Sequence, residues 1–222
     1  MKAGNWTYGC CRDVPEVVPV FPLPCALLLP GADLPLNIFE PRYIAMIDAA
    51  IQGSRIIGMI QPDDKAGGCP RGPSLRDVGC LGRIVSFAET GDGRYLVTLT
   101  GIARFRIVEE LTTTTPYRQC RISSAPFSVD FDCQAEAIDR EAVLRAFRAY
   151  LQAHRLAADW ETVDRASDEM LVNALAMMAP FGPAEKQALL EAPDLRARAE
   201  TLIAITEMTL AEKRGGNPRS LQ

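Results

Sequence analysis

Histidine, lysine and uninterrupted apolar sequence are what this chain has least of. Its 222 residues include one histidine, His154, and four lysines. No lysine follows a glycine, so the pair that cradles phosphates in a P-loop is missing and ATP binding through a Walker motif is excluded. A Ser-His-Asp triad would depend on His154, which the local periodicity places on the apolar stripe of a helix, where we expect a packed histidine instead.

The most apolar stretch, residues 17–43, is interrupted by six prolines. A membrane-spanning helix does not tolerate them, because each proline removes a backbone donor and lipid offers no replacement partner. Residues 1–16 lack the charged and apolar regions of a signal peptide, so we expect a cytoplasmic protein with no membrane partner. We predict that the stretch supplies short buried strands instead, VVPVFPL (17–23) and CALLLPG (25–31).

Acidic residues outnumber basic ones by 28 to 24, which gives a net charge of −4. Such a chain has no overall field that would draw it to nucleic acid or to an acidic membrane surface. An RNA-binding module remains an alternative, because arginines alternating along a strand beside aromatic rings would suit single-stranded RNA. The residues expected on that face are Arg104, Arg106, Arg118 and Arg121, with Tyr117 and Phe127 as stacking surfaces.

The seven cysteines form an odd set without the regular spacing of a disulfide framework, so reduced thiols are expected. Cys25 and Cys120 lie in apolar or strand sequence and are predicted to be small buried hydrophobic residues. Zinc would need Cys69, Cys80 and the Cys10–Cys11 pair without any C-x-x-C motif. No metal or other cofactor is therefore expected, and the role of these last cysteines stays open.

Ser74 in RGPSLRD, residues 71–77, is a candidate nucleophile, because a glycine-proline-serine turn can expose a serine side chain. A Ser-Lys dyad also needs a lysine base, and none occurs between Lys65 and Lys186. We therefore predict no catalytic residue and no enzymatic activity. A hydrolase that acts through Ser74 or a cysteine is the alternative.

Secondary structure was predicted from periodicity and turn residues. Apolar residues at helical spacing between Pro41 and Gly53 predict one short helix. Strands are expected in 54–64 and in 117–127. Residues 80–111 are predicted to form two strands around an Asp92–Gly93 turn and a third strand after Gly101. Residues 65–79 are predicted to be a loop. Helices are expected in 133–155, 168–179, 182–192 and 193–214, the first with a stripe of Val143, Phe147, Tyr150, Leu151 and His154.

These elements predict an α+β fold in which a barrel-like domain precedes a helical bundle. The expected divisions are an N-terminal extension (1–15), the barrel with one short helix (16–130), the helical bundle (131–214) and a flexible tail (215–222).

Five segments, taken in order, resemble the N-terminal domain of the Lon protease family, and in particular its small stand-alone bacterial members. They are VVPVFPL, LPGADLPLNIFEPRYIAMIDAAI, IGMIQPDD, VGCLGRIVSFAETGDGRYLVTLTGIARFRIVEEL and PYRQCRI, and the helical half adds PFGPAEKQALLEAPDLRARAETL. The resemblance implies a PUA-like β-barrel followed by a helical bundle, related to the Lon-like domain of cereblon, without the ATPase and protease modules of Lon.

By this resemblance we expect a non-catalytic module that recognises unfolded or exposed apolar polypeptide segments. Its partners would be such polypeptides or a protease or chaperone, and it would act as an adaptor or chaperone-like factor in protein quality control. The candidate binding residues lie in NIFEPRY: Phe39, Glu40, Arg42 and Tyr43. They would line the rim of a groove, or else Glu40 and Arg42 cap and pair locally while Phe39 and Tyr43 join the core.

Overall fold

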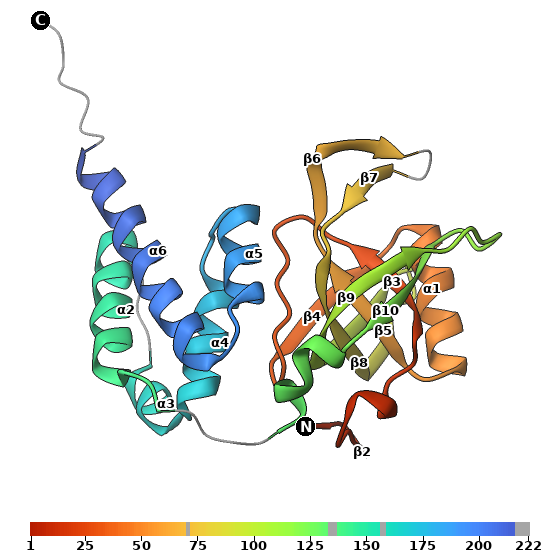
Figure 1. The fold of residues 1–222 in the computed structure, drawn as a ribbon. Coiled ribbons are helices and arrows are strands. Elements are labelled where there is room, and N and C mark those ends of the chain that lie inside the picture. The colour runs from red at the N-terminus through yellow and green to blue at the C-terminus, as the bar shows by residue number, and fades with distance from the viewer. Residues whose placement is uncertain (70–71, 133–136, 156–158, 216–222) are drawn as a thin grey trace, which may run out of the picture. The chain divides into compact units, whose positions relative to one another are not determined.

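The structure is a computed structural model that describes residues 1–69, 72–132, 137–155 and 159–215 (Figure 1). The chain divides into two compact units. The first contains residues 1–134 together with 181–190, and the second contains 135–180 together with 191–222. The division at 130/131 expected from the sequence stays a prediction, and the inclusion of 181–190 in the first unit is a feature that the sequence did not suggest.

The first unit is built mainly from strands. A six-stranded sheet has the order β10-β3-β5-β8-β9-β4, and β10 pairs with β9 as well as with β3. Two further sheets, β1-β2 and β6-β7, have two strands each. The strands are β1 (Lys2–Ala3), β2 (Trp6–Thr7), β3 (Val17–Pro22), β4 (Asp33–Ile38), β5 (Ile56–Ile60), β6 (Pro62–Cys69), β7 (Gly72–Leu75), β8 (Val78–Glu89), β9 (Tyr95–Glu110) and β10 (Arg118–Ser123). The helical segments are η1 (Cys11–Asp13), α1 (Pro41–Gln52), η2 (Ala125–Phe131) and α5 (Pro183–Glu191).

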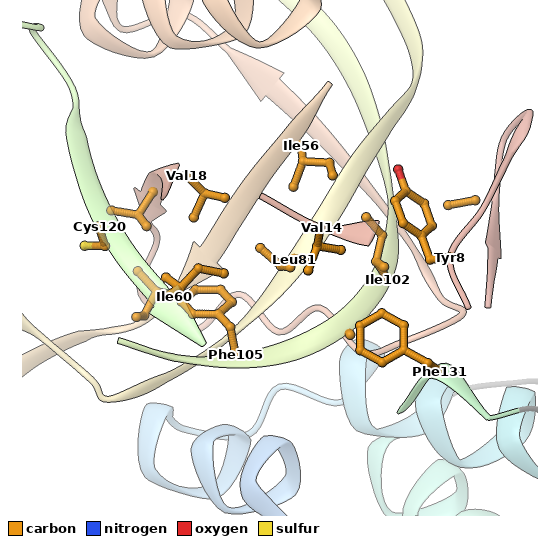
Figure 2. Close-up of a cluster of buried hydrophobic side chains, with 14 residues drawn as sticks. Tyr8, Val14, Val18, Ile56, Ile60, Leu81, Ile102, Phe105, Cys120 and Phe131 are labelled. Atoms are coloured by element: carbon orange, nitrogen blue, oxygen red, sulfur yellow. The ribbon is translucent and has the colours of Figure 1, made fainter. Parts of the chain in front are cut away.

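The first unit contains a cluster of buried hydrophobic side chains. It includes apolar side chains from strands that are distant in the sequence, such as Val18, Ile56, Leu81 and Phe105, together with Tyr8, Val14 and Phe131 from outside the strands (Figure 2). Phe105 comes from β9 and is fully buried, as expected from its position on the apolar side of that strand. Burial of this surface is the main favourable term that holds the strands together.

Three predictions about this unit are wrong. CALLLPG is not a strand: Leu27, Leu28 and Leu29 are buried in irregular structure, and the strand that follows is β4. Cys25 is exposed, with a positive φ of 61°, and not buried. Residues 65–79 are not simply a loop, because they contribute to β6, β7 and β8; residues 70–71 lie outside the described residues.

β9 also differs from its prediction, because it runs unbroken through Gly101 where two strands were expected. The pairing register with β8 shifts beside this glycine, between Leu81 and Gly82. A Cβ at position 101 would collide with the backbone carbonyl of Leu29. Gly101 therefore marks a bulge and a close backbone approach within one strand, not the end of a strand.

Helix α1 confirms the helix predicted from Pro41 to Gly53. Pro41 occupies the first turn, where its missing N–H costs nothing, and the N–H of Gly53 donates to Ala50 at the other end. Tyr43, Met46, Ile47 and Ala50 form the buried face of the helix. The Tyr95 hydroxyl on β9 donates to Asp48 at 3.1 Å, which ties α1 to the sheet.

The second unit consists of helices α2 (Arg140–His154), α3 (Trp160–Arg165), α4 (Asp168–Met178) and α6 (Leu195–Gly215). Asp139 and Ser167 cap the N-termini of α2 and α4 by accepting backbone N–H bonds. α2 and α4 both contact α6, and the predicted stripe on α2 buries Val143, Tyr150 and Leu151. Within the described ranges, no helix of the chain is long and apolar enough to cross a membrane.

Candidate functional site

The candidate residues lie where β4 passes into α1. Glu40 is the N-cap of the helix, and its backbone carbonyl accepts the N–H groups of Tyr43 and Ile44. Its side chain makes no capping bond and instead accepts from Arg42, with 2.9 Å between Nε and Oε2. Both side chains of this ion pair are about half exposed, so the guanidinium is accessible while it donates to Glu40.

Tyr43 lies beneath this pair and belongs to the core. It is only 6% exposed, its ring packs against Phe21 of β3 at 4.2 Å between centroids, and the Arg42 guanidinium stands over the ring at 4.5 Å. Burial raises the pKa of the Tyr43 phenol above its ordinary value. Tyr43 therefore supports Arg42 from below and offers little contact area of its own.

Phe39, by contrast, is 63% exposed and is not part of the core. It follows Ile38, which pairs with Tyr95, and Asn37 pairs with Leu96. β4 ends at Ile38, and continuing its alternation by one residue places Phe39 on the side of Asn37, diagonal to Leu96.

Leu96 is itself 48% exposed and pairs on its other side with Ala88 of β8. We call the exposed set Asn37, Phe39, Ala88 and Leu96 the outer face. The sequence analysis missed Leu96, although the alternation in YLVTLT gives the signal: Val97 and Leu99 are buried, and Leu96 is the apolar residue on the opposite side. Phe39 and Leu96 are thus both accessible, and Phe39 directly precedes the residues of the Glu40–Arg42 ion pair in the chain.

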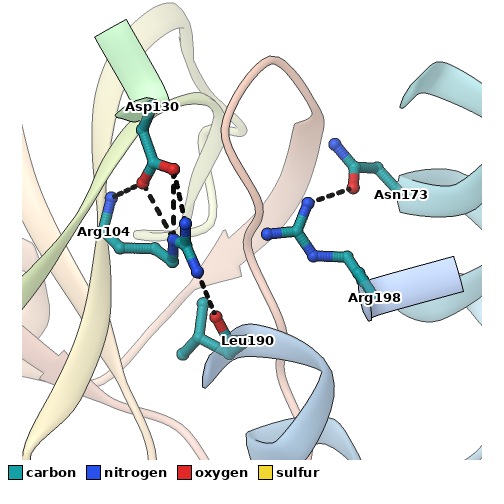
Figure 3. A network of polar contacts seen from close by, with 5 residues as sticks. All are labelled: Arg104, Asp130, Asn173, Leu190 and Arg198. Carbon is teal, nitrogen blue, oxygen red and sulfur yellow. Dashed lines mark hydrogen bonds and ion pairs between the residues drawn. The ribbon is translucent and has the colours of Figure 1, made fainter. Parts of the chain in front are cut away.

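The basic face that would have suited RNA is only half present: Arg106 and Arg121 are exposed, the latter paired with Glu109, but Arg104 and Arg118 are buried. Arg104 is 1% exposed and makes a bidentate ion pair with Asp130, and its Nη1 donates to the carbonyl of Leu190 (Figure 3). Arg118 is 8% exposed and pairs with Glu110. The ring of Phe127 is buried under the Arg104 guanidinium, so it is not available to stack on a base.

The structure also locates the residues considered for catalysis and metal binding. Ser74 lies on strand β7, opposite Asp63 of β6. His154 stacks on Tyr150 at the end of α2, with 4.1 Å between ring centroids. Among the described residues no group of three or more His, Cys, Asp or Glu side chains could hold a metal ion.

The described cysteines divide by exposure. Cys10 and Cys25 are exposed and Cys11 is half-buried, whereas Cys80 and Cys120 are buried. The predicted burial of Cys120 is thus confirmed, and burial raises the pKa of its thiol to about 12, which keeps it protonated and unreactive at neutral pH. Cys133 lies outside the described residues, as does the side chain of Cys69.

Comparison with known proteins identifies relatives of the whole arrangement. The chain is 29% identical over 198 residues to Lon protease 2 of Myxococcus xanthus, covering 87% of this chain and 24% of that protein. It is also 29% identical to Lon protease of Anaeromyxobacter dehalogenans, covering 87% of this chain and 23% of the relative. The chain thus spans about a quarter of the length of these curated relatives.

Solved structures share the fold. The N-terminal domain of Mycobacterium avium complex Lon protease superposes with a TM-score of 0.62 at 21% identity, covering 86% of this chain and 98% of that one. A Lon N-terminal domain protein from Xanthomonas campestris gives a TM-score of 0.58 at 22% identity, covering 85% and 97%. The mixed α and β fold expected from the sequence is therefore that of Lon N-terminal domains.

A family model described as the ATP-dependent protease La (LON) substrate-binding domain matches residues 17–207. This match spans both units and includes β4, the candidate residues and the outer face. It confirms the resemblance drawn from the sequence segments. The chain belongs to the family of LON substrate-binding domains.

Proposed function

We propose that the chain is a non-catalytic module that binds unfolded or exposed apolar segments of polypeptides. The observation that carries this proposal is the pair of accessible apolar side chains on the outer face, Phe39 and Leu96, next to the junction of β4 and α1. An exposed aromatic residue beside an accessible arginine has the composition of a protein-binding hot spot. The description of the family as a substrate-binding domain supports the same class of ligand.

The four candidate residues take different roles in this proposal. Phe39 is the apolar anchor, and Arg42 presents its guanidinium to a carbonyl or carboxylate of the bound polypeptide. Glu40 orients Arg42 through their ion pair. Tyr43, buried against Phe21, is a positioning residue that fixes the first turn of α1.

Other parts of the sequence-based account remain proposals. We propose a PUA-like β-barrel, because β10 pairs with both β3 and β9 and so links the two parts of the sheet, and a helical bundle formed by the second unit. A role as adaptor or chaperone-like factor in quality control, acting with a separate protease or chaperone, is a further proposal, and the description of the family as a substrate-binding domain supports it. A cytoplasmic location remains a prediction that cell fractionation would test.

Two alternative functions have less support. RNA binding loses half of its basic face, because Arg104 and Arg118 are buried in ion pairs, and the exposed Arg121 is paired with Glu109. A hydrolase would have to use Ser74 or an exposed cysteine without the lysine base that a Ser-Lys dyad needs. The family match concerns a substrate-binding domain, which supports a non-catalytic role.

The proposal is tested by titrating fluorescently labelled β-casein, an unfolded polypeptide, into the wild-type protein and three variants. Phe39→Ser and Arg42→Ala should each weaken binding by about 1–2 kcal/mol, or roughly 5- to 30-fold, with unchanged melting temperatures. Val108→Ser is the matched control, because Val108 is equally exposed but lies at the other end of β9. Equal affinity of all four proteins would refute the assignment of the site.

A further inference from the structure

β4 differs from every other strand of the six-stranded sheet in having a single neighbour. β3, β5, β8 and β10 each pair on two sides, and β9 pairs with β8, β10 and β4, whereas β4 pairs only with β9 in the part of the chain that the structure describes. A six-residue strand is about 20 Å long, which is enough to accept another strand along its length. β4 is thus the open edge of this sheet.

The hydrogen-bond ladder shows which backbone groups of β4 point to that edge. Gly101 N–H donates to the carbonyl of Ala32 at 2.9 Å, a bond that flanks the pair Asp33 and Thr100. In an antiparallel ladder such a bond flanks a pair that is not itself hydrogen-bonded, and bonded and non-bonded pairs alternate. Asp33, Pro35 and Asn37 are therefore the residues whose backbone groups point away from β9.

These three residues are accessible. Asp33, Pro35 and Asn37 are all exposed, whereas Ile38, which belongs to the bonded set, is buried. Within the described ranges no backbone hydrogen bond reaches the outer edge of β4. The edge therefore presents N–H groups at positions 33 and 37 and carbonyl groups at 33, 35 and 37, since proline has no N–H to present.

We infer that the open edge of β4 accepts an extended segment of a client polypeptide as a seventh strand. A row of alternating backbone donors and acceptors is complementary to another extended backbone, and such pairing supplies affinity with little demand on sequence. This inference rests on the proposed function and assigns it a binding geometry. It explains how a small exposed apolar face can hold unfolded polypeptides, because main-chain hydrogen bonds add to the contact with Phe39.

A client segment fits this edge better than a second copy of the chain. If two β4 edges paired around a two-fold axis at Pro35, proline would face proline and both hydrogen bonds of the central pair would be lost. A client with any other residue opposite Pro35 still donates its N–H to the Pro35 carbonyl. Pro35 thus disfavours pairing between two copies of β4 and leaves the edge accessible to other polypeptides. Prolines on the edge strands of natural proteins have the same effect.

The side chains around the edge predict a preference in the client. A residue opposite Asn37 lies on the side of the outer face, diagonal to Phe39, so a large apolar side chain is favoured there. A residue opposite Asp33 faces a carboxylate that already accepts a bond from the Thr100 hydroxyl at 2.6 Å, so a lysine or arginine is favoured. In antiparallel pairing, the more stable arrangement, the basic residue follows the apolar one by four positions.

The test uses a labelled acetylated nonapeptide of alternating valine and threonine that carries leucine and, four residues later, lysine. N-methylation of the leucine or the lysine removes a donor that faces β4 and should weaken binding about tenfold. N-methylation of either residue next to the leucine removes a donor that faces solvent and should change affinity less than threefold. Replacing the lysine with glutamate should also weaken binding severalfold.

Asn37→Pro supplies a second measurement on the protein itself, because it removes the N–H at position 37. Asn37→Val keeps that N–H and is the matched control. We expect Asn37→Pro to weaken peptide and β-casein binding at least about tenfold more than Asn37→Val does, because only the proline removes the N–H; equal losses in the two variants would contradict strand addition.

The outcomes separate this inference from the proposed function. If N-methylation at all positions has the same effect, while Phe39→Ser still weakens binding of β-casein, strand addition is wrong and the polypeptide-binding function stands. If neither the nonapeptide nor β-casein binds, both are wrong. If N-methylation weakens binding only at every second residue of the peptide, the result supports the inference even when Asn37→Pro fails to fold.

Discussion

Tyr43→Ala should separate folding from binding at the candidate site, because Tyr43 is buried while its neighbour Arg42 is accessible. The substitution removes a ring that packs against Phe21 with 4.2 Å between centroids. Truncating a buried aromatic residue to alanine costs about 3–5 kcal/mol. In a unit of roughly 140 residues each kcal/mol shifts the melting temperature by about 3–5 °C, so we expect a decrease of about 10–20 °C.

The assay is a thermal melt and a β-casein titration on the same samples, with the titration performed well below both melting temperatures. Phe39→Ser is the reciprocal variant, because Phe39 is mostly exposed and its loss should change stability by less than about 0.5 kcal/mol. Tyr43→Ala should lower the melting temperature, and Phe39→Ser should lower only the affinity. A wild-type melting temperature for Tyr43→Ala would refute the assignment of Tyr43 to the core.

Tyr43→Phe adds a readout that depends on pH. Because burial raises the pKa of Tyr43, the phenol ionises at lower pH in the unfolded chain than in the folded one. Burial of the neutral phenol contributes fully to the free energy of unfolding at pH values below the pKa of the unfolded phenol, near 10. This contribution is lost as the pH rises above that value. The wild type should therefore lose stability relative to Tyr43→Phe above that pH, and parallel pH profiles for the two proteins would contradict this.

Three further predictions follow from the rest of the structure. Asp130→Asn leaves the buried Arg104 guanidinium without its counter-charge and should destabilise the first unit by about 3–5 kcal/mol in urea unfolding, so a change below 1 kcal/mol would contradict the buried pair. In native protein at pH 8, Cys10 should react with iodoacetamide much faster than Cys120, as mass spectrometry of digested samples would show, and equal rates would contradict the burial of Cys120. The purified protein should hydrolyse neither ATP nor casein, and Ser74→Ala should change nothing; casein cleavage that disappears in Ser74→Ala would establish the hydrolase alternative.

The sequence predicted those elements whose signals are local. Pro41 and Gly53 bound α1 because a proline at the first turn and a glycine after the last one are signals that depend only on the helix itself. The strand around Ile57 and the strand around Cys120 were recognised from β-branched and alternating residues in the same way. Tyr43 shares helical spacing with Ile47, and both side chains lie on the buried face of α1.

The features that the sequence analysis predicted wrongly or did not suggest depend on contacts between residues that are far apart in the sequence. Arg104 was assigned to a solvated face by alternation, but Asp130 in η2 supplies a counter-charge from 26 residues away, and no local pattern reveals this. α5 belongs to the first unit because Gln187 donates to the Val78 carbonyl and Gln61 donates to Gln187, over more than a hundred residues. Single-sequence periodicity contains no information about such contacts.

The sequence proposed the segment NIFEPRY as the candidate site, but it did not resolve the roles of the residues within it. The sequence analysis placed Phe39 and Tyr43 together, either on the rim of a groove or in the core. The structure separates them, because Phe39 precedes the helix and follows the exposed side of β4, whereas Tyr43 lies on the buried face of α1. The accessibility of Leu96 depends on its pairing with Asn37 and Ala88, which requires the strand register.

The central claim is that this domain binds unfolded polypeptide at the outer face and the β4 edge without cleaving it. Site-specific photocrosslinking tests it most directly, with a benzoylphenylalanine at position 39 and, as control, at position 108, where Val108 is 60% exposed. After irradiation with labelled β-casein, we predict a strong crosslink from position 39, little from position 108, and full-length casein in both samples. Equal crosslinking from the two positions, or shortened casein, would contradict the claim.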